Sequence, residues 1–228
     1  MISVFYFSGN GHSRTVAEYI AKELNCDCVD ICVPESSVQS FETAVAVFPV
    51  YCQNIPKPVK AFLKMLDAKN VALLATYGKI SCGNVLFEAE KLVKGRVIAG
   101  AYVPTGHSFL NGKAEFDKNA LLMLCERIKS PIAITVPKRT KHVFANLFPA
   151  WRSRIGVRIK KNGSCDGCGM CDAVCPMNAM RLGTPNSKCI RCLKCVSACP
   201  QKALKFENSF VLNKYLMGHC FDELIVYL

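Results

Sequence analysis

The chain has 228 residues, of which 51% are hydrophobic and 20% are charged. These values are ordinary for a soluble globular protein, and the length suffices for one large domain or two smaller ones. No apolar stretch approaches the roughly 18 to 20 residues that span a bilayer. The first residues, Met1-Ile2-Ser3-Val4, lack the basic region of a signal peptide. We therefore expect neither an integral membrane segment nor secretion.

The formal net charge is +12, because 29 basic residues outnumber 17 acidic ones. Such a charge attracts acidic partners, and it suits an acidic protein about as well as a nucleic acid. No nucleic-acid recognition motif accompanies the charge, so we do not expect nucleic-acid binding.

The first apolar run, residues 2–7, is short, β-branched and aromatic, which is typical of a buried parallel strand. A small polar loop follows, Ser8-Gly9-Asn10-Gly11-His12-Ser13, and then a helix with Val16, Ile20 and Leu24 at intervals of four. Ser13 is placed to cap this helix. A strand, a glycine-containing loop and a helix N-terminus form a cradle whose N–H groups favour a phosphate.

Further strands are predicted at residues 27–33, 44–50, 71–76 and 97–103, and helices at residues 58–66, 84–93 and 115–128. Only the crossover at residues 34–43 is too short and polar for a good helix. This alternation predicts an α/β fold with a doubly wound, five-stranded parallel sheet. Its ligand site is expected outside the carboxyl ends of the strands.

Two more loops follow the third and fourth strands, and each contains an aromatic residue, Tyr51 or Tyr77. With the loop from Ser8 to Ser13, they resemble the phosphate loop and the two ring-binding loops of flavodoxins. The resemblance implies FMN, with both tyrosines available to stack on its ring. The cofactor-binding residues that it implies are Ser8, Asn10, Gly11, His12, Ser13, Val50, Tyr51, Cys52, Gln53, Thr76, Tyr77, Gly78 and Gly83.

The chain departs from the flavodoxin pattern at some of these positions. Many flavodoxins have threonine and asparagine where this loop has Asn10 and His12, and neither ring loop contains tryptophan. A flavodoxin-like scaffold without flavin is therefore the alternative. Cys52 and Cys82 are either packing groups or thiols that modulate a flavin. His107 follows the fifth strand, at the same end of the sheet, and could contact a ring or a substrate.

Residues 137–161 form a connector with eight basic residues and no acidic one. Phe144, Phe148, Trp151 and Ile155 recur at helical spacing, although Pro149 interrupts or begins a helix. The connector is either a linker with solvated charges or a docking patch for an acidic electron carrier.

One four-cysteine motif occurs twice, offset by 24 residues, and a proline follows each copy. The copies are Cys165, Cys168, Cys171 and Cys175, and Cys189, Cys192, Cys195 and Cys199. A cubane 4Fe-4S cluster needs one soft thiolate on each of four irons, and three cysteines at this spacing can wrap three corners. Structural zinc sites group cysteines two by two, and disulfide frameworks suit short secreted chains, so clusters are favoured.

The duplicated motif resembles two-cluster bacterial ferredoxins, in which the cysteine before proline binds the cluster of the other half. The resemblance implies two 4Fe-4S clusters, with Cys199 completing the first site and Cys175 the second. Free thiols and oxygen-sensitive clusters indicate a reducing cytoplasm and anaerobic metabolism.

Over residues 1–210 the chain resembles bacterial flavodoxin–ferredoxin fusion proteins. The expected parts are a flavodoxin-like domain (1–136), a basic linker (137–156), a small α+β ferredoxin-like domain (157–210) and a tail (211–228) that docks as a helix. FMN accepts two electrons as a pair, whereas each cluster carries one. We expect an electron relay to or from an acidic redox protein. The alternatives are a flavin-dependent reductase fed by the clusters, with catalytic residues unknown, and a ferredoxin with a flavin-free docking domain.

Overall fold

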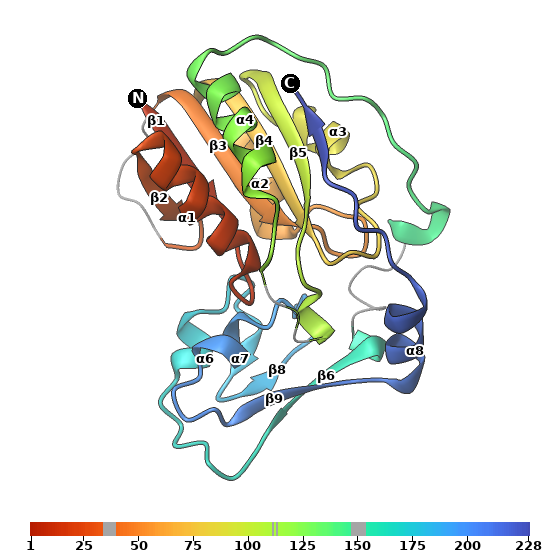
Figure 1. Ribbon diagram of the computed structural model, residues 1–228. Helices are drawn as coiled ribbons and strands as arrows, with labels where there is room; N and C mark the ends of the chain where they lie inside the picture. Colours follow the sequence, from red (N-terminus) through yellow and green to blue (C-terminus); the bar gives the residue numbers. More distant parts are fainter. Residues whose placement is uncertain (34–39, 111, 113, 147–153) are drawn as a thin grey trace. The chain divides into compact units, whose positions relative to one another are not determined.

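The computed structural model describes the chain except residues 34–39, 111, 113 and 147–153 (Figure 1). The described residues form two compact units: an N-terminal unit of Met1–Ala145 and Phe221–Leu228, and a cysteine unit of Asn146–Cys220. The chain segments on both sides of the cysteine unit therefore belong to the N-terminal unit. The functional domains expected at 1–136 and 157–210 stay predictions.

Five parallel strands form most of the sheet in the N-terminal unit. They are Ile2–Tyr6 (β1), Asp27–Asp30 (β2), Phe41–Pro49 (β3), Ala68–Tyr77 (β4) and Arg96–Pro104 (β5). Their order is β5-β4-β3-β1-β2, so the winding reverses between β1 and β3. This confirms the doubly wound parallel sheet, and it is the order of flavodoxin-like folds, whose ligands bind at that reversal.

A sixth strand, Ile225–Tyr227 (β10), pairs antiparallel with β5 at the edge of the sheet. The tail was expected to dock as a helix. A helix does form at Phe210–Gly218 (α8), but the residues of β10 form a strand instead. The three residues of β10 are β-branched or aromatic, and they pair with the edge of β5. A strand of this length has too few residues to give a periodic signal in the sequence.

Helices cover both faces of the sheet (Figure 1). They are His12–Leu24 (α1), Lys57–Met65 (α2), Val85–Glu90 (α3) and Lys118–Lys129 (α4), with short 3-10 helices at Ser108–Leu110 and Val143–Ala145. Val4 of β1 joins the core cluster formed with α1 and α4. The next residue, Phe5, packs on Phe62 of α2, with ring centroids 5.2 Å apart. Successive residues of the strand therefore point to opposite faces of the sheet, and each packs against the helices on its own face.

The cysteine unit is small and contains paired elements. Its strands are Val157–Lys161 (β6), Met180–Arg181 (β7), Thr184–Pro185 (β8) and Leu204–Asn208 (β9), and its short helices are Met170–Ala173 (α6) and Lys194–Ala198 (α7). β6 pairs antiparallel with β9. These small strands and helices are consistent with a ferredoxin-like domain.

The sequence repeat is also a backbone repeat. Left-handed residues recur 24 positions apart at Gly167 and Arg191, at Gly169 and Leu193, and at Asn178 and Lys202. The second copy adopts the same path with side chains that normally avoid a positive φ. The left-handed conformation therefore recurs in the second copy without glycine at positions 191 and 193.

Among the described residues, no helix is long and apolar enough to cross a membrane.

Candidate functional site

Four loops of the N-terminal unit follow the carboxyl ends of β1, β3, β4 and β5. They contain the predicted phosphate loop, the two predicted ring loops, and residues 105–112 with His107. Because the strands are parallel, all four loops lie at one edge of the sheet.

The loop before α1 is shaped to accept an anion. Gly11 has φ +100, and its backbone N–H donates to Ser8 Oγ at 3.1 Å. A Cβ at Gly11 would meet no atom within 4 Å. α1 has neither a side-chain N-cap nor an acidic residue in its first turn, so its N–H groups and dipole remain for a bound phosphate. These residues fit the phosphate of FMN.

Ser13 does not cap α1 as the sequence indicated. Its buried hydroxyl lies 2.7 Å from Thr76 Oγ1 at the end of β4, and this contact joins the phosphate loop to the second ring loop. A buried hydroxyl needs a partner, and Thr76 supplies one. Two predicted binding residues are therefore brought together.

Two imidazoles with a lowered pKa lie near each other, that of His12 in the phosphate loop and that of His107 after β5. Burial lowers the pKa of His12, while hydrogen bonds to the carbonyls of Gly106 and Gly112 oppose this. Burial and the nearby His12 lower the pKa of His107 to about 4. The amide of Phe109 donates to His107 Nδ1 at 3.2 Å, so the proton of the neutral ring is on Nε2. His12 also lies next to Asn10, with Nε2 and Nδ2 3.4 Å apart.

The first ring loop is a tight turn. Tyr51 and Asn54 exchange two backbone hydrogen bonds of 3.0 and 2.9 Å, and the residues between them, Cys52 and Gln53, have φ of 50 and 61. Two consecutive left-handed residues define a type I′ hairpin turn, which costs roughly 1–2 kcal/mol per non-glycine residue. Tyr51 is half-buried and meets Phe7 edge-on. Val50, just before it, donates its N–H to the carbonyl of Thr76 at 2.8 Å.

The second ring loop is packed against the C-terminal segment. Tyr77 is only 2% exposed, its hydroxyl donates to the carbonyl of Glu223, and its ring lies 5.8 Å from that of Phe221. Burial raises the pKa of Tyr77. Its stacking on a flavin ring stays a prediction, and this packing opposes it.

Gly78 and Gly83, in or near that loop, each contact a residue from another part of the N-terminal unit. A Cβ at Gly78 would be 2.5 Å from Cδ2 of His107, so only glycine allows this approach. The Tyr102 hydroxyl donates to the carbonyl of Gly83 at 3.3 Å and accepts from the N–H of Leu86 at 2.9 Å. Cys82, beside Gly83, is buried, and burial raises the pKa of its thiol.

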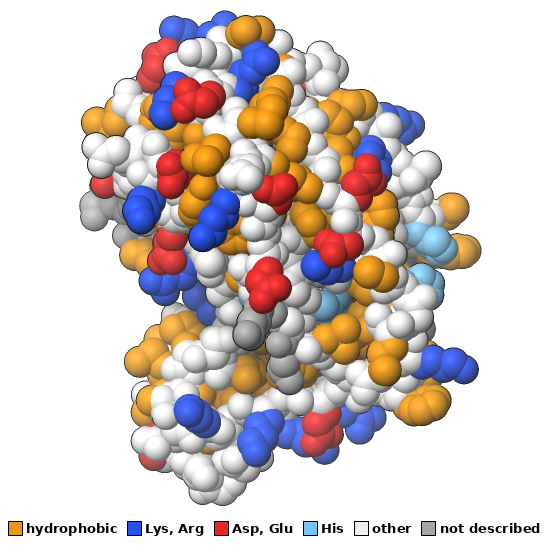
Figure 2. All heavy atoms as spheres, in the orientation of Figure 1, with side chains coloured by type: hydrophobic (Ala, Val, Ile, Leu, Met, Phe, Trp, Pro, Cys, Tyr) orange, Lys and Arg blue, Asp and Glu red, His pale blue; other side chains and the backbone are white. Residues whose placement is uncertain are grey.

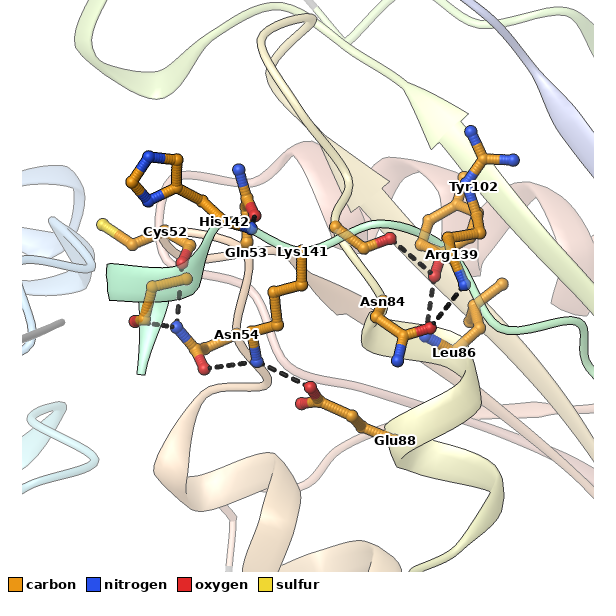
Figure 3. Close-up of polar contacts among 12 residues, drawn as sticks. Cys52, Gln53, Asn54, Asn84, Leu86, Glu88, Tyr102, Arg139, Lys141 and His142 are labelled. Carbon is orange, nitrogen blue, oxygen red and sulfur yellow. Dashed lines mark hydrogen bonds and ion pairs between the residues drawn. The ribbon is translucent and has the colours of Figure 1, made fainter. Parts of the chain in front are cut away.

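The first part of the connector is bound to the N-terminal unit (Figure 3). Lys141 Nζ contacts Asn54 Oδ1 at 2.9 Å and Glu88 Oε1 at 2.6 Å, and the Lys141 side chain is 12% exposed. The backbone N–H of His142 donates to Gln53 Oε1 at 2.8 Å, and that of Arg139 to Asn84 Oδ1 at 2.8 Å. The expectation of solvated linker charges is wrong for Lys141.

The predicted apolar stripe of the connector lies partly outside the described residues. Phe144 lies in a 3-10 helix, whereas Phe148, Pro149 and Trp151 lie outside the described residues. On the face seen in Figure 2, basic and acidic side chains are intermingled over α1 and α4. The docking patch for an acidic carrier, expected on residues 137–161, stays a prediction.

An apolar cavity in the cysteine unit contains four of the predicted cluster ligands. Cys189, Cys192 and Cys195 of the second copy line it together with Cys175 of the first. The other lining residues are Ile159, Pro176, Met177, Met180, Ile190 and Leu193. This is the grouping that the ferredoxin resemblance implies for the second cluster.

Beside the first set of cysteines, a hydrogen bond joins the two copies of the motif. Asp166, next to Cys165, accepts a hydrogen bond from Gln201, two residues after Cys199. The thiols before the two prolines also have equivalent donors: Ala179 N–H to Cys175 Sγ at 3.2 Å, and Ala203 N–H to Cys199 Sγ at 3.3 Å. N–H groups directed at sulfur are one of the means by which proteins stabilise and tune clusters.

The chemistry of the donor set fits a cluster core. Burial, and then neighbouring thiols, raise the pKa of Cys192 and Cys195 to about 12, and a bound cationic iron core would favour their thiolate forms. Within the described residues, no three Cys, His, Asp or Glu side chains are placed to share a single metal ion. A cubane distributes its ligands over four irons and does not require such convergence.

Three features of these sites were missed in the sequence: the bonds of residues 139–145 to the first ring loop, those of 221–223 to the second, and the link between Asp166 and Gln201. Each joins residues far apart in the chain by polar contacts, which leave no periodic signal. The basic residues before position 145 were recognised only as charges.

Two family matches correspond to the two units. Residues 3–80 match the flavodoxin domain family, and residues 185–205 match the 4Fe-4S binding domain family. No curated protein matches the chain.

Two similar solved structures are described as putative flavoproteins. One, from Bacteroides uniformis ATCC 8492, has 16% identity and a TM-score of 0.41, over 55% of this chain and 97% of that chain. The other, from Bacteroides eggerthii DSM 20697, has 17% identity and a TM-score of 0.40, over 56% of this chain and 97% of that chain. The family matches, in their order along the sequence, show that this chain joins an N-terminal flavodoxin domain to a C-terminal 4Fe-4S motif, the arrangement of a flavodoxin–ferredoxin fusion.

Proposed function

We propose that this chain is an electron relay that holds FMN in its N-terminal unit and two 4Fe-4S clusters in its cysteine unit. A flavodoxin domain and a 4Fe-4S motif on one chain support electron transfer in general. The flavin would exchange electrons in pairs or singly, and each cluster would carry one. The partner we propose is an acidic redox protein, in keeping with the net charge of +12.

The observation that carries the two-cluster proposal is the cavity shared by Cys175 and the cysteines of the second copy. A single cluster would use four of the eight motif cysteines and leave a second, equally built set without a role. The repeated left-handed positions and the matched donors to Cys175 and Cys199 support two equivalent sites.

The residues of the chain have separable tasks in this proposal. The N–H groups at the start of α1 bind the phosphate, and the half-buried Tyr51 is available to stack on the flavin ring. The apolar lining around Cys189 and Cys195 excludes water, and the N–H groups of Ala179 and Ala203 stabilise charge on sulfur. We place the protein in the reducing cytoplasm, where thiols and clusters persist.

The test is an anaerobic purification in which iron, acid-labile sulfide and flavin are quantified on one sample. The proposal predicts about eight irons and one FMN per chain. About four irons would contradict the second cluster. Iron without flavin would support a ferredoxin with a docking domain, and reduction of a small molecule at the flavin would support the reductase.

A further inference from the structure

The side chain of Asn54 connects the first ring loop to the residues that lead into the cysteine unit. Its Nδ2 donates to the carbonyl of Cys52 at 2.8 Å and to the carbonyl of Ala145 at 2.7 Å, while its Oδ1 accepts from Lys141 Nζ. Asn54 is 7% exposed, so these bonds are made away from water. One amide thus fixes the turn and the connector to each other (Figure 3).

The conformation of the turn at Cys52 and Gln53 must be stabilised by residues outside the turn. Cys52 and Gln53 are both non-glycine residues with positive φ, a conformation that the surrounding structure must enforce. The restraint comes from residues 139–145, because Lys141 and Ala145 hold Asn54 and the N–H of His142 holds Gln53.

The second ring loop is held by the segment that leaves the cysteine unit. The Tyr77 hydroxyl both donates to the carbonyl of Glu223 and accepts from its N–H. The N–H of Phe221 donates to the carbonyl of Lys79 at 2.7 Å, and Lys79 Nζ pairs with Asp222 at 2.7 Å. Lys79 also has a positive φ of 57, so this loop too is held in a conformation that it would not favour alone.

The cysteine unit is therefore joined to the N-terminal unit by two chain segments, and each segment is bonded to a different ring loop. We propose that residues 139–145 and 221–223 position the two ring loops and thereby set the affinity and the redox potential of the bound flavin. This inference rests on the proposed function. Lys141 and Tyr77 act in it as positioning residues, through Asn54 and through the backbone of the second ring loop.

The test compares Lys141→Met and Tyr77→Phe with two matched controls in the full chain with its clusters. Lys138→Met makes the same charge change at an exposed position just before the segment 139–145, and Tyr215→Phe removes an exposed hydroxyl from α8. FMN affinity is measured by anaerobic fluorescence titration, and the two one-electron midpoint potentials of the flavin by potentiometry. Iron content and thermal midpoint report on folding.

We expect each positioning variant to raise the FMN Kd about tenfold and to shift a flavin potential. A tenfold change in Kd corresponds to the loss of one charge-assisted or buried hydrogen bond. The controls should match the wild type, and Lys141→Arg should recover most of the affinity. Tyr77→Phe keeps the ring and tests the inference even where Lys141→Met is unstable.

Wild-type FMN binding with a Kd within twofold and unchanged potentials in both variants would overturn this inference alone. A wild-type chain that binds no FMN would overturn the proposed function and this inference with it.

Discussion

Gln201 donates a hydrogen bond from Nε2 to Asp166 Oδ2 at 3.1 Å. The contact joins the two copies of the cysteine motif, since Asp166 lies between Cys165 and Cys168 and Gln201 follows Cys199 and its proline. Cys175 of the first copy also lines the cavity that contains the cysteines of the second copy. Both observations support ligation in which each copy completes the cluster of the other.

Crossed ligation makes a prediction for double variants. Cys175→Ala with Cys192→Ala removes two ligands of one cluster, so about four irons per chain should remain. Cys175→Ala with Cys168→Ala removes one ligand from each cluster, and iron should fall toward zero. The measurement is iron and sulfide content after anaerobic purification. If the results of the two pairs are exchanged, Cys175 belongs to the cluster of its own copy.

Gly78 should not tolerate a side chain. In Gly78→Ala the new Cβ would clash with Cδ2 and Cα of His107, at 2.5 and 3.0 Å, and the backbone carbon cannot rotate away. We expect a loss of about 1–3 kcal/mol in the free energy of unfolding, measured by chemical denaturation, and weaker FMN binding. Gly163→Ala is the control, because a Cβ there meets no atom within 4 Å. Equal stability of the two variants would contradict the close approach.

Acid should destabilise the N-terminal unit through the half-buried imidazoles of His12 and His107. The pKa of His107 falls from 6.5 to about 4 on folding, so between these values the unfolded chain binds the extra proton. This contribution to stability is full above about pH 6.5 and is lost as the pH falls toward 4; the lowered pKa of His12 acts in the same direction.

Thermal unfolding of the flavin-free chain at pH 7 and pH 5 tests this effect. The wild-type midpoint should drop on acidification, and His107→Gln should drop less. His219→Gln, at an exposed position, is the control and should behave as the wild type. An equal drop in wild type and His107→Gln would show that His107 does not titrate on unfolding.

Much of this architecture could be predicted from the sequence, because buried parallel strands leave apolar runs and cluster ligands leave fixed spacings. The five parallel strands and the cysteine motifs were recognised in this way. The strand β10 was missed because three residues give no period.

The side-chain roles were harder to predict. Ser13 was assigned as a helix cap from local spacing, but its hydroxyl meets Thr76, which is 63 positions away in the sequence. Tyr77 was expected to face a ligand, and the contacts with Phe221 and Glu223 that bury it come from the far end of the chain. Such contacts depend on tertiary packing and cannot be inferred from the pattern around either residue.

The central claim is that electrons pass within one chain between the flavin and the clusters. The most direct measurement is flash photoreduction of the flavin in the anaerobic holoprotein, followed at wavelengths that separate flavin from cluster absorbance. The account predicts that flavin reoxidation and cluster reduction occur together, at a rate independent of protein concentration. A rate that rises in proportion to protein concentration, or clusters that stay oxidised, would contradict it.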